Sequence, residues 1–227
     1  LLSELSDAVI NKSGGTFNYP IRNTDRSVGA IISGLIAQHH GNKGMDEHPI
    51  KLNFTGTAGQ SFGVWNAGGL EMTLAGDAND YVGKGMADGK LVIHPPRGVS
   101  FKSNESVIAG NTCLYGATGG KLFAAGLAGE RFAVRNSGAI AVVEGIGDNG
   151  CEYMTGGIVA VLGRTGVNFG AGMTGGFAYI LDEQNDIEQR VNGELVELMS
   201  IEDQVILMEH LRGLINQHYE ETGSEHA

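Results

Sequence analysis

The sequence is poor in the features that mark secreted and membrane-spanning proteins. It has only two cysteines, Cys113 and Cys151, which are too few for a disulfide framework. It has no apolar run near the roughly 18 residues that a membrane-spanning helix requires, and no recognisable signal peptide. We therefore expect both cysteines to be reduced and buried, and the protein to be cytoplasmic, with no membrane partner.

Basic residues are also scarce. The chain has 15 Lys and Arg against 26 Asp and Glu, which gives a formal net charge of −11. Nearly all of this charge lies in residues 182–227, where the only basic residues are Arg190 and Arg212. Binding to a phosphate backbone requires a basic stripe, so we expect no nucleic-acid partner. The same contrast marks residues 182–227 as a separate acidic segment.

Proline is rare and glycine is abundant. The chain has 4 prolines but 37 glycines in 227 residues, about twice the usual glycine share of about 7%. Disorder does not explain this excess, because 41% of the residues are hydrophobic. Each glycine in a regular element costs about 0.5–1 kcal/mol relative to alanine. So many glycines predict many backbone positions at which a Cβ atom would clash.

The glycines belong to an internal repeat. Three 19-residue stretches, which begin at Lys51, Lys121 and Ile158, align without a gap. Less regular units of residues 70–89, 90–120 and 140–157 continue the series from about residue 51 to residue 176. The columns shared by the three regular stretches are Gly56, Gly126 and Gly163; Gly59, Gly129 and Gly166; Phe62, Phe132 and Phe169; and Gly68, Gly138 and Gly175.

Each repeat unit predicts one short strand. It opens with an apolar run of four to six residues, which is too short for a helix between glycines. The unit of residues 90–120 is the longest, and its extra residues around 94–97 predict a loop that leaves the repeat. One strand per unit cannot bury its apolar face alone, so the units are expected to stack on one another.

Stacked coils give a consistent fold. Each strand would pair in parallel with the same strand of the next coil about 4.8 Å away, the phenylalanine column would lie in the core, and the glycine columns would mark corners with positive φ. A coil this short has no room for a βαβ crossover helix, and the equal spacing favours a solenoid over a meander of hairpins. The sequence therefore predicts an all-β solenoid, a parallel β-helix of about seven coils, over residues 51–181.

The flanking segments are suited to covering the open ends of the solenoid. In residues 1–50, residues 19–21 are expected to be extended, and residues 23–25 to cap a helix that ends at Gly41. In residues 182–227, residues 200–203 resemble a capping box before a helix. We expect both helices to act as capping helices, the second with its apolar side at Val205, Met208, Leu211 and Ile215.

Several motifs suggest chemistry, but a structural interpretation is favoured for each. Residues 170–175 match the GxGxxG fingerprint, which requires a following helix, whereas residues 177–181 predict a strand. Residues 145–148 resemble one unit of a calcium-binding repeat, which requires many stacked copies, so a turn is favoured. His39 and His40 are adjacent on the expected helix and face different ways, which favours surface histidines over a metal site.

No stronger catalytic signature is present in the sequence. We find no Walker sequence, no GxSxG elbow and no convincing Cys/His or paired-carboxylate arrangement. Asp25 and Arg26 are interpreted as a local ion pair rather than as a contact to a neighbouring domain. The sequence therefore assigns no catalytic, no cofactor-binding and no metal-ligating residue.

Residues 19–30 (YPIRNTDRSVGA), the glycine columns and residues 218–224 (HYEETGS) together resemble the carboxy-terminal domain of glutamate synthase large subunits. The resemblance covers essentially the entire chain, and it implies a right-handed parallel β-helix. It also implies a parent oxidoreductase of ammonia assimilation and glutamate biosynthesis. That enzyme converts glutamine and 2-oxoglutarate into two glutamates, with electrons from a reduced nicotinamide cofactor such as NADPH.

The resemblance implies that the catalytic residues and cofactors of this family lie in other domains. It implies a glutaminase domain with an amino-terminal cysteine, a barrel domain that holds FMN and an iron–sulfur cluster, and a small subunit with FAD and NADPH. None of those residues can be carried onto this sequence. We therefore expect a non-catalytic segment of a longer polypeptide, which holds the glutaminase and FMN domains in place while ammonia passes between them.

Three alternatives remain open. One is the β-helical subunit of formylmethanofuran dehydrogenase, a related structural protein with similar glycine repeats. A hexapeptide-repeat acyltransferase would place an aliphatic residue at every sixth position, which these columns do not. A stand-alone ligand-binding β-helix would need exposed aromatic or acidic columns, whereas the phenylalanine column is expected in the core.

Overall fold

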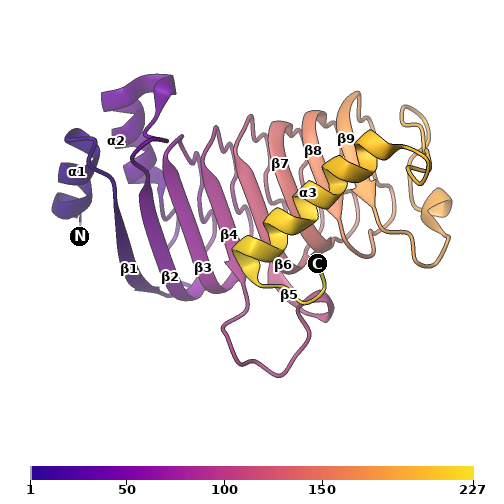
Figure 1. The fold of residues 1–227 in the computed structure, drawn as a ribbon, viewed down its shortest axis with the longest axis horizontal. Helices are drawn as coiled ribbons and strands as arrows, with labels where there is room; N and C mark the ends of the chain where they lie inside the picture. Colours follow the sequence, from indigo (N-terminus) through magenta and orange to yellow (C-terminus); the bar gives the residue numbers. More distant parts are fainter. Residues whose placement is uncertain (1) are drawn as a thin grey trace.

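A single sheet wound into a solenoid dominates the molecule (Figure 1). The computed structural model describes residues 2–227. The sheet is 9-stranded and parallel throughout, in the order β1-β2-β3-β4-β6-β7-β8-β9, with β5 beside β3 and β6. The predicted all-β solenoid of about 7 turns is confirmed. The strands are β1 (Gly15–Ile21), β2 (Ile50–Ala58), β3 (Leu70–Ala78), β4 (Lys90–His94), β5 (Val107–Ala109), β6 (Lys121–Ala128), β7 (Ser137–Gly145), β8 (Thr155–Val161) and β9 (Gly175–Ile180).

Helices lie before, between and after the strands. The sheet already begins at β1, within the flanking segment of residues 1–50, because β1 pairs with β2 along its full length. Residues 19–21 are extended, as expected. The helices are α1 (Leu2–Ile10), α2 (Ala30–His40) and α3 (Val205–Thr222), with short 3-10 turns at η1 (Gly41–Lys43), η2 (Ser103–Glu105) and η3 (Ile187–Gln189).

The core of the solenoid is built from rows of equivalent residues. Because the strands pair in register, side chains at one position of the repeat stack above each other along the solenoid axis. The predicted phenylalanine column is confirmed as part of this core, since Phe62, Phe132 and Phe169 are all buried. One inner row, buried throughout, consists of Leu52, Met72, Leu91, Leu122, Ala141 and Val159.

The outer face of the sheet changes character along the axis. At the position next to the inner row, β2 and β3 carry the polar residues Asn53 and Thr73. From β4 onward the same position is apolar and buried. We call this apolar series the outer row; it consists of Val92, Phe123, Val142, Ala160 and Tyr179.

Helix α3 covers the outer row and does not cap the end of the solenoid (Figure 1). The helix lies diagonally across β4 to β9, and Leu214 is buried against the outer row. The prediction of a second end-capping helix was therefore wrong in its position, because a sheet that is apolar on both faces must be covered on both. The predicted apolar side is also only partly correct: Leu211 and Ile215 pack on the sheet, whereas Val205 and Met208 are exposed.

The chain covers the two ends of the solenoid in different ways. At the amino-terminal end, α1 packs against α2, and α2 ends at Gly41, as predicted. Helix α2 begins later than expected, after Gly29, because the Asp25 carboxylate accepts the backbone N–H of Arg22 and does not cap the helix. At the other end, residues 182–204 cover the last coil, where Val191 pairs with Phe169.

The glycine columns serve mainly for close approach rather than for positive φ. Gly56 and Gly126 do have positive φ, at 131° and 148°. The other members of the columns lack it, and a Cβ at Gly138 would meet the carbonyl oxygen of Thr118 in the preceding coil. The expectation of corners with positive φ was therefore wrong for most of these positions, where the backbones of adjacent coils leave no room for a side chain.

Candidate functional site

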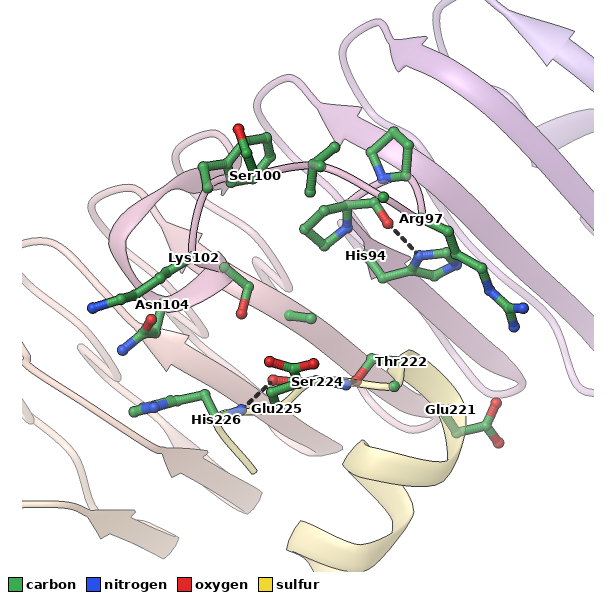
Figure 2. A pocket seen from close by; sticks show the side chains of 18 of the residues that line it. His94, Arg97, Ser100, Lys102, Asn104, Glu221, Thr222, Ser224, Glu225 and His226 are labelled. Atoms are coloured by element: carbon green, nitrogen blue, oxygen red, sulfur yellow. Dashed lines mark hydrogen bonds between the residues drawn. The ribbon is translucent and has the colours of Figure 1, made fainter.

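The predicted excursion from the repeat borders a wide cleft (Figure 2). After β4, Pro95 and Pro96 cannot donate hydrogen bonds to a sheet ladder, so the chain leaves the coil there. The excursion loop, residues 95–106, arches over the C-terminal tail, residues 220–226. The cleft between them has a volume of about 940 Å³.

Charges of both signs line this cleft. Its basic side chains include His94, Arg97 and Lys102. Its acidic side chains come from the tail. Some of the charged side chains in and near the cleft form ion pairs: Lys102 with Glu105 at 3.0 Å, and Lys90 with Glu221 at 2.6 Å. A site for a phosphate or a carboxylate would concentrate one sign of charge, which this cleft does not do.

A buried carboxylate lies where the tail meets the sheet. Glu144 projects from β7 on the outer face and is only 1% exposed. Ser224 donates its hydroxyl hydrogen to Oε1 of Glu144, and Nε2 of His218 lies 3.3 Å from the same oxygen. We call these three residues the Glu144 clamp. They hold the end of α3 and the tail against the sheet.

The environment of Glu144 favours its charged form. Burial alone would raise the pKa of this carboxyl, but hydrogen bonds from His218, Ser224 and Ser103, together with the charge of His218, outweigh burial and hold the pKa below its usual value. The tail is fixed further by His226, whose Nε2 donates to the carbonyl oxygen of Leu162 at 2.7 Å.

The Glu144 clamp is not arranged as a nucleophilic triad. In a triad the histidine accepts the proton of the serine, whereas here Ser224 donates to the carboxylate. All three residues are also buried, and the hydroxyl hydrogen of Ser224 is already donated to the carboxylate of Glu144. The clamp therefore has the geometry of a structural contact.

The motifs singled out in the sequence occupy structural positions. Residues 170–175 form a turn that leads into β9, as expected, and no helix follows them. Oδ1 of Asp148 accepts the backbone N–H of Val167 in the next coil. Nε2 of His40 lies 2.7 Å from the carbonyl oxygen of Val9. These contacts tie neighbouring segments together.

Asp25 and Arg26, interpreted from the sequence as an ion pair, are not paired with each other. Within residues 2–227 the Asp25 carboxylate accepts the backbone N–H of Arg22 at 2.8 Å and forms no ion pair with Arg26. The carboxylate therefore closes the turn that precedes α2, because its hydrogen bond is to the backbone three residues earlier.

The two cysteines are buried and unreactive. Cys113 and Cys151 lie in different coils as free thiols, and burial raises the pKa of each to about 12. Over residues 2–227, no three His, Cys, Asp or Glu side chains gather where they could hold a metal ion. The described residues therefore do not fit an iron–sulfur cluster, which requires several thiolates.

A family model described as "GXGXG motif" matches residues 1–227, the whole chain. The chain belongs to the GXGXG family. The close-approach glycines of its coils and the docked tail are thus features of a GXGXG chain.

The GXGXG chain is similar to part of several much longer proteins. It is 54% identical over 223 residues to "Ferredoxin-dependent glutamate synthase" from Pyropia yezoensis, which is 98% of this chain and 14% of that protein. It is 54% identical over 205 residues to "Glutamate synthase [NADH]" from Schizosaccharomyces pombe, 90% of this chain and 10% of that protein. It is 51% identical over 221 residues to "Ferredoxin-dependent glutamate synthase 2, chloroplastic" from Arabidopsis thaliana, which is 97% of this chain and 13% of that protein.

One wall of the GXGXG solenoid exposes aromatic rings, which the repeat pattern of the sequence did not predict. Trp65 and Tyr153 occupy equivalent turns with positive φ and are 62% and 58% exposed. Each ring lies against a glycine of the next coil, Gly85 and Gly172, where a Cβ would collide with it. Exposed aromatic side chains are typical of protein–protein contact surfaces.

A second exposed apolar surface of the GXGXG chain lies at the carboxy-terminal end of the solenoid. It comes from the segment between the last coil and the first turns of α3. We call it the end patch; it consists of Leu195, Leu198, Met199, Val205, Ile206 and Met208. Among the helices of residues 2–227, none has the length and apolar character needed to cross a membrane.

Proposed function

We propose that this chain is a non-catalytic structural domain of a glutamate synthase. The observation that carries the proposal is its similarity, over 90–98% of its own length, to 10–14% of proteins named glutamate synthase. The parent would convert glutamine and 2-oxoglutarate into two glutamates. In it, this domain would hold the glutaminase and FMN-binding domains in place so that ammonia passes between them.

The fold suits such a spacer. Coils that stack at about 4.8 Å give a sheet roughly 34 Å long from β1 to β9. Every coil is tied to its neighbours by parallel pairing and by a close-packed inner row. A rod of this kind resists bending, because each coil would have to break contacts with the next. Two domains bound to it would keep a fixed separation.

The cofactors are proposed to lie outside this domain. FMN and the iron–sulfur cluster would belong to the barrel domain, and FAD and NADPH to a small-subunit partner. One relative is named for ferredoxin and another for NADH, and both are 54% identical to this chain. The sequence of this segment therefore does not identify the electron donor. A cytoplasmic location remains part of the proposal, although three relatives are named chloroplastic.

The proposal is tested by changing the length of the rod in the parent enzyme. Duplicating residues 51–70 adds one coil without a register shift, because Lys51 and Glu71 are register partners. We expect glutamine hydrolysis to continue while the free ammonia released per glutamate formed rises several-fold. Removing residues 51–180 should uncouple the two reactions more completely.

The matched control inserts a Gly/Ser segment of the same length at Gly98, an exposed position of the excursion loop. This insertion leaves the coils unchanged, so coupling should persist. Both enzymes are assayed for ammonia and glutamate with glutamine as the nitrogen source, and again with free ammonia. If the extra coil left the ratio of ammonia to glutamate unchanged, a spacer role would be excluded.

A further inference from the structure

The end patch is unusually exposed for a set of large apolar side chains. Ile206 is 81% exposed and Val205 is 69% exposed, both in the first turn of α3. Leu195, Leu198 and Met199 are exposed in the segment just before the helix. Several large apolar side chains exposed in one segment of a folded protein are typical of a contact site.

The segment that carries the end patch is held in place. Val196 packs against the hydrophobic core, and Val191 pairs with Phe169 of the last coil. The guanidinium of Arg190, itself buried, donates to the carbonyl oxygen of Thr165 at 2.7 Å. The patch is therefore presented in one arrangement, which reduces the entropy lost when a partner binds.

The charges around the end patch indicate what kind of surface covers it. Residues 193–209 contain no Lys or Arg. Within residues 2–227, none of the carboxylates of this stretch forms an ion pair. A complementary partner must therefore be basic and must offer apolar pockets. The carboxylates of this stretch are Glu194, Glu197, Glu202, Asp203 and Glu209.

The geometry points to an intramolecular contact: we propose that the end patch docks on a basic, apolar-pocketed surface elsewhere in the same longer polypeptide. This inference rests on the proposed function, in which the chain is one domain of a larger enzyme. The chain spans only 10–14% of its relatives, so most of the polypeptide that could supply this surface lies outside it. A second copy of the chain is disfavoured, because two acidic patches would repel each other.

The test uses the full-length parent enzyme. Hydrogen exchange is followed by mass spectrometry for the peptide of residues 193–209, in the wild type and in the double variant Val205→Ser, Ile206→Ser. We expect slow exchange in the wild type and exchange about tenfold faster in the variant, since losing about 1.4 kcal/mol of docking free energy has that effect. Raising the salt concentration should also speed exchange in the wild type.

The control variant is Ile31→Ser, which removes an exposed apolar side chain from α2 at the opposite end of the solenoid. It should leave exchange of residues 193–209 unchanged. Fast exchange of this peptide in the wild type, equal to that in the double variant, would show a solvent-facing patch and overturn the inference. Protection that disappears on dilution would instead identify a second copy as the partner, which also overturns it.

This test and the coil-duplication test can fail independently. If the peptide exchanges fast while the extra coil still uncouples the reactions, the spacer role stands and only the docking site is wrong. If the peptide is protected while the extra coil has no effect on coupling, the contact exists but does not control ammonia transfer.

Discussion

At the scale of single residues, Glu144 is the side chain on which the attachment of the tail depends. Its carboxylate is buried and accepts hydrogen bonds from groups that lie more than seventy residues away in the sequence. A buried charge that loses its partners is costly, so the clamp favours the docked tail only while the carboxylate is ionised. Stability should therefore depend on pH through this group.

We predict that acid weakens the clamp. The folded-state pKa of Glu144 is lowered, so the unfolded chain binds the proton more tightly and the stabilisation is present above the unfolded pKa of about 4.3. It is lost as pH falls below that value through the folded pKa. The free energy of unfolding, measured in urea between pH 7 and pH 3, should fall more steeply in the wild type than in Glu144→Gln. Equal slopes in the two proteins would contradict the prediction.

Residue types predicted the core better than they predicted backbone conformation. Phe62, Phe132 and Phe169 could be assigned to the core because one aromatic recurs at a fixed place in each regular unit. The positive-φ positions could not be found in this way, since Trp65 and Tyr153 adopt a conformation that bulky residues rarely choose. There, the path of the coil and its bonds to neighbouring coils override local preference.

At the scale of elements, the placement of α3 is explained by the composition of the strands. Residues 51–57 alternate between apolar and polar, as expected for a strand with one face in solvent. Residues 91–93, 122–125 and 159–162 are continuously apolar, which is typical of strands covered on both faces. This signal was available in the sequence and would have placed a covering element over the later coils.

Replacing Phe123 with alanine should destabilise the fold by about 3–5 kcal/mol, because it removes the largest fully buried side chain of the outer row and leaves a cavity beneath α3. The control is Thr73→Ala, at the same row position but two strands away, where α3 does not lie. It should change stability by less than about 0.5 kcal/mol. Thermal and urea unfolding provide the comparison. Similar losses of stability in both variants would refute the conclusion that α3 covers the outer row.

At the scale of the whole molecule, the solenoid is completed by segments that the repeat does not encode. The number of coils and their parallel pairing followed from the spacing of the columns. The clamp and the end patch did not follow, because they depend on where a non-repeating segment returns to the sheet. Residues 218–224 were notable in the sequence only through a family resemblance, and the structure gives two of them, His218 and Ser224, a physical task.

Deleting residues 205–227 should turn the chain into a self-associating species, because the outer row would face solvent. We expect a concentration-dependent increase in molar mass by light scattering and stronger binding of the dye ANS. Deleting only residues 225–227 keeps the Glu144 clamp and should leave a monomer. A monomeric chain without α3 and without extra dye binding would show that the outer row needs no cover.

The order of covering also matters while the protein is being made. The apolar outer row begins at Val92 in β4, yet the helix that shields it ends only at Thr222. At about 5–20 residues per second, translation leaves the growing sheet with a bare apolar stripe for roughly 7–26 seconds. During that interval the nascent coils expose apolar surface of the kind that chaperones bind. A chain released before its last helix has been synthesised would therefore be prone to aggregate.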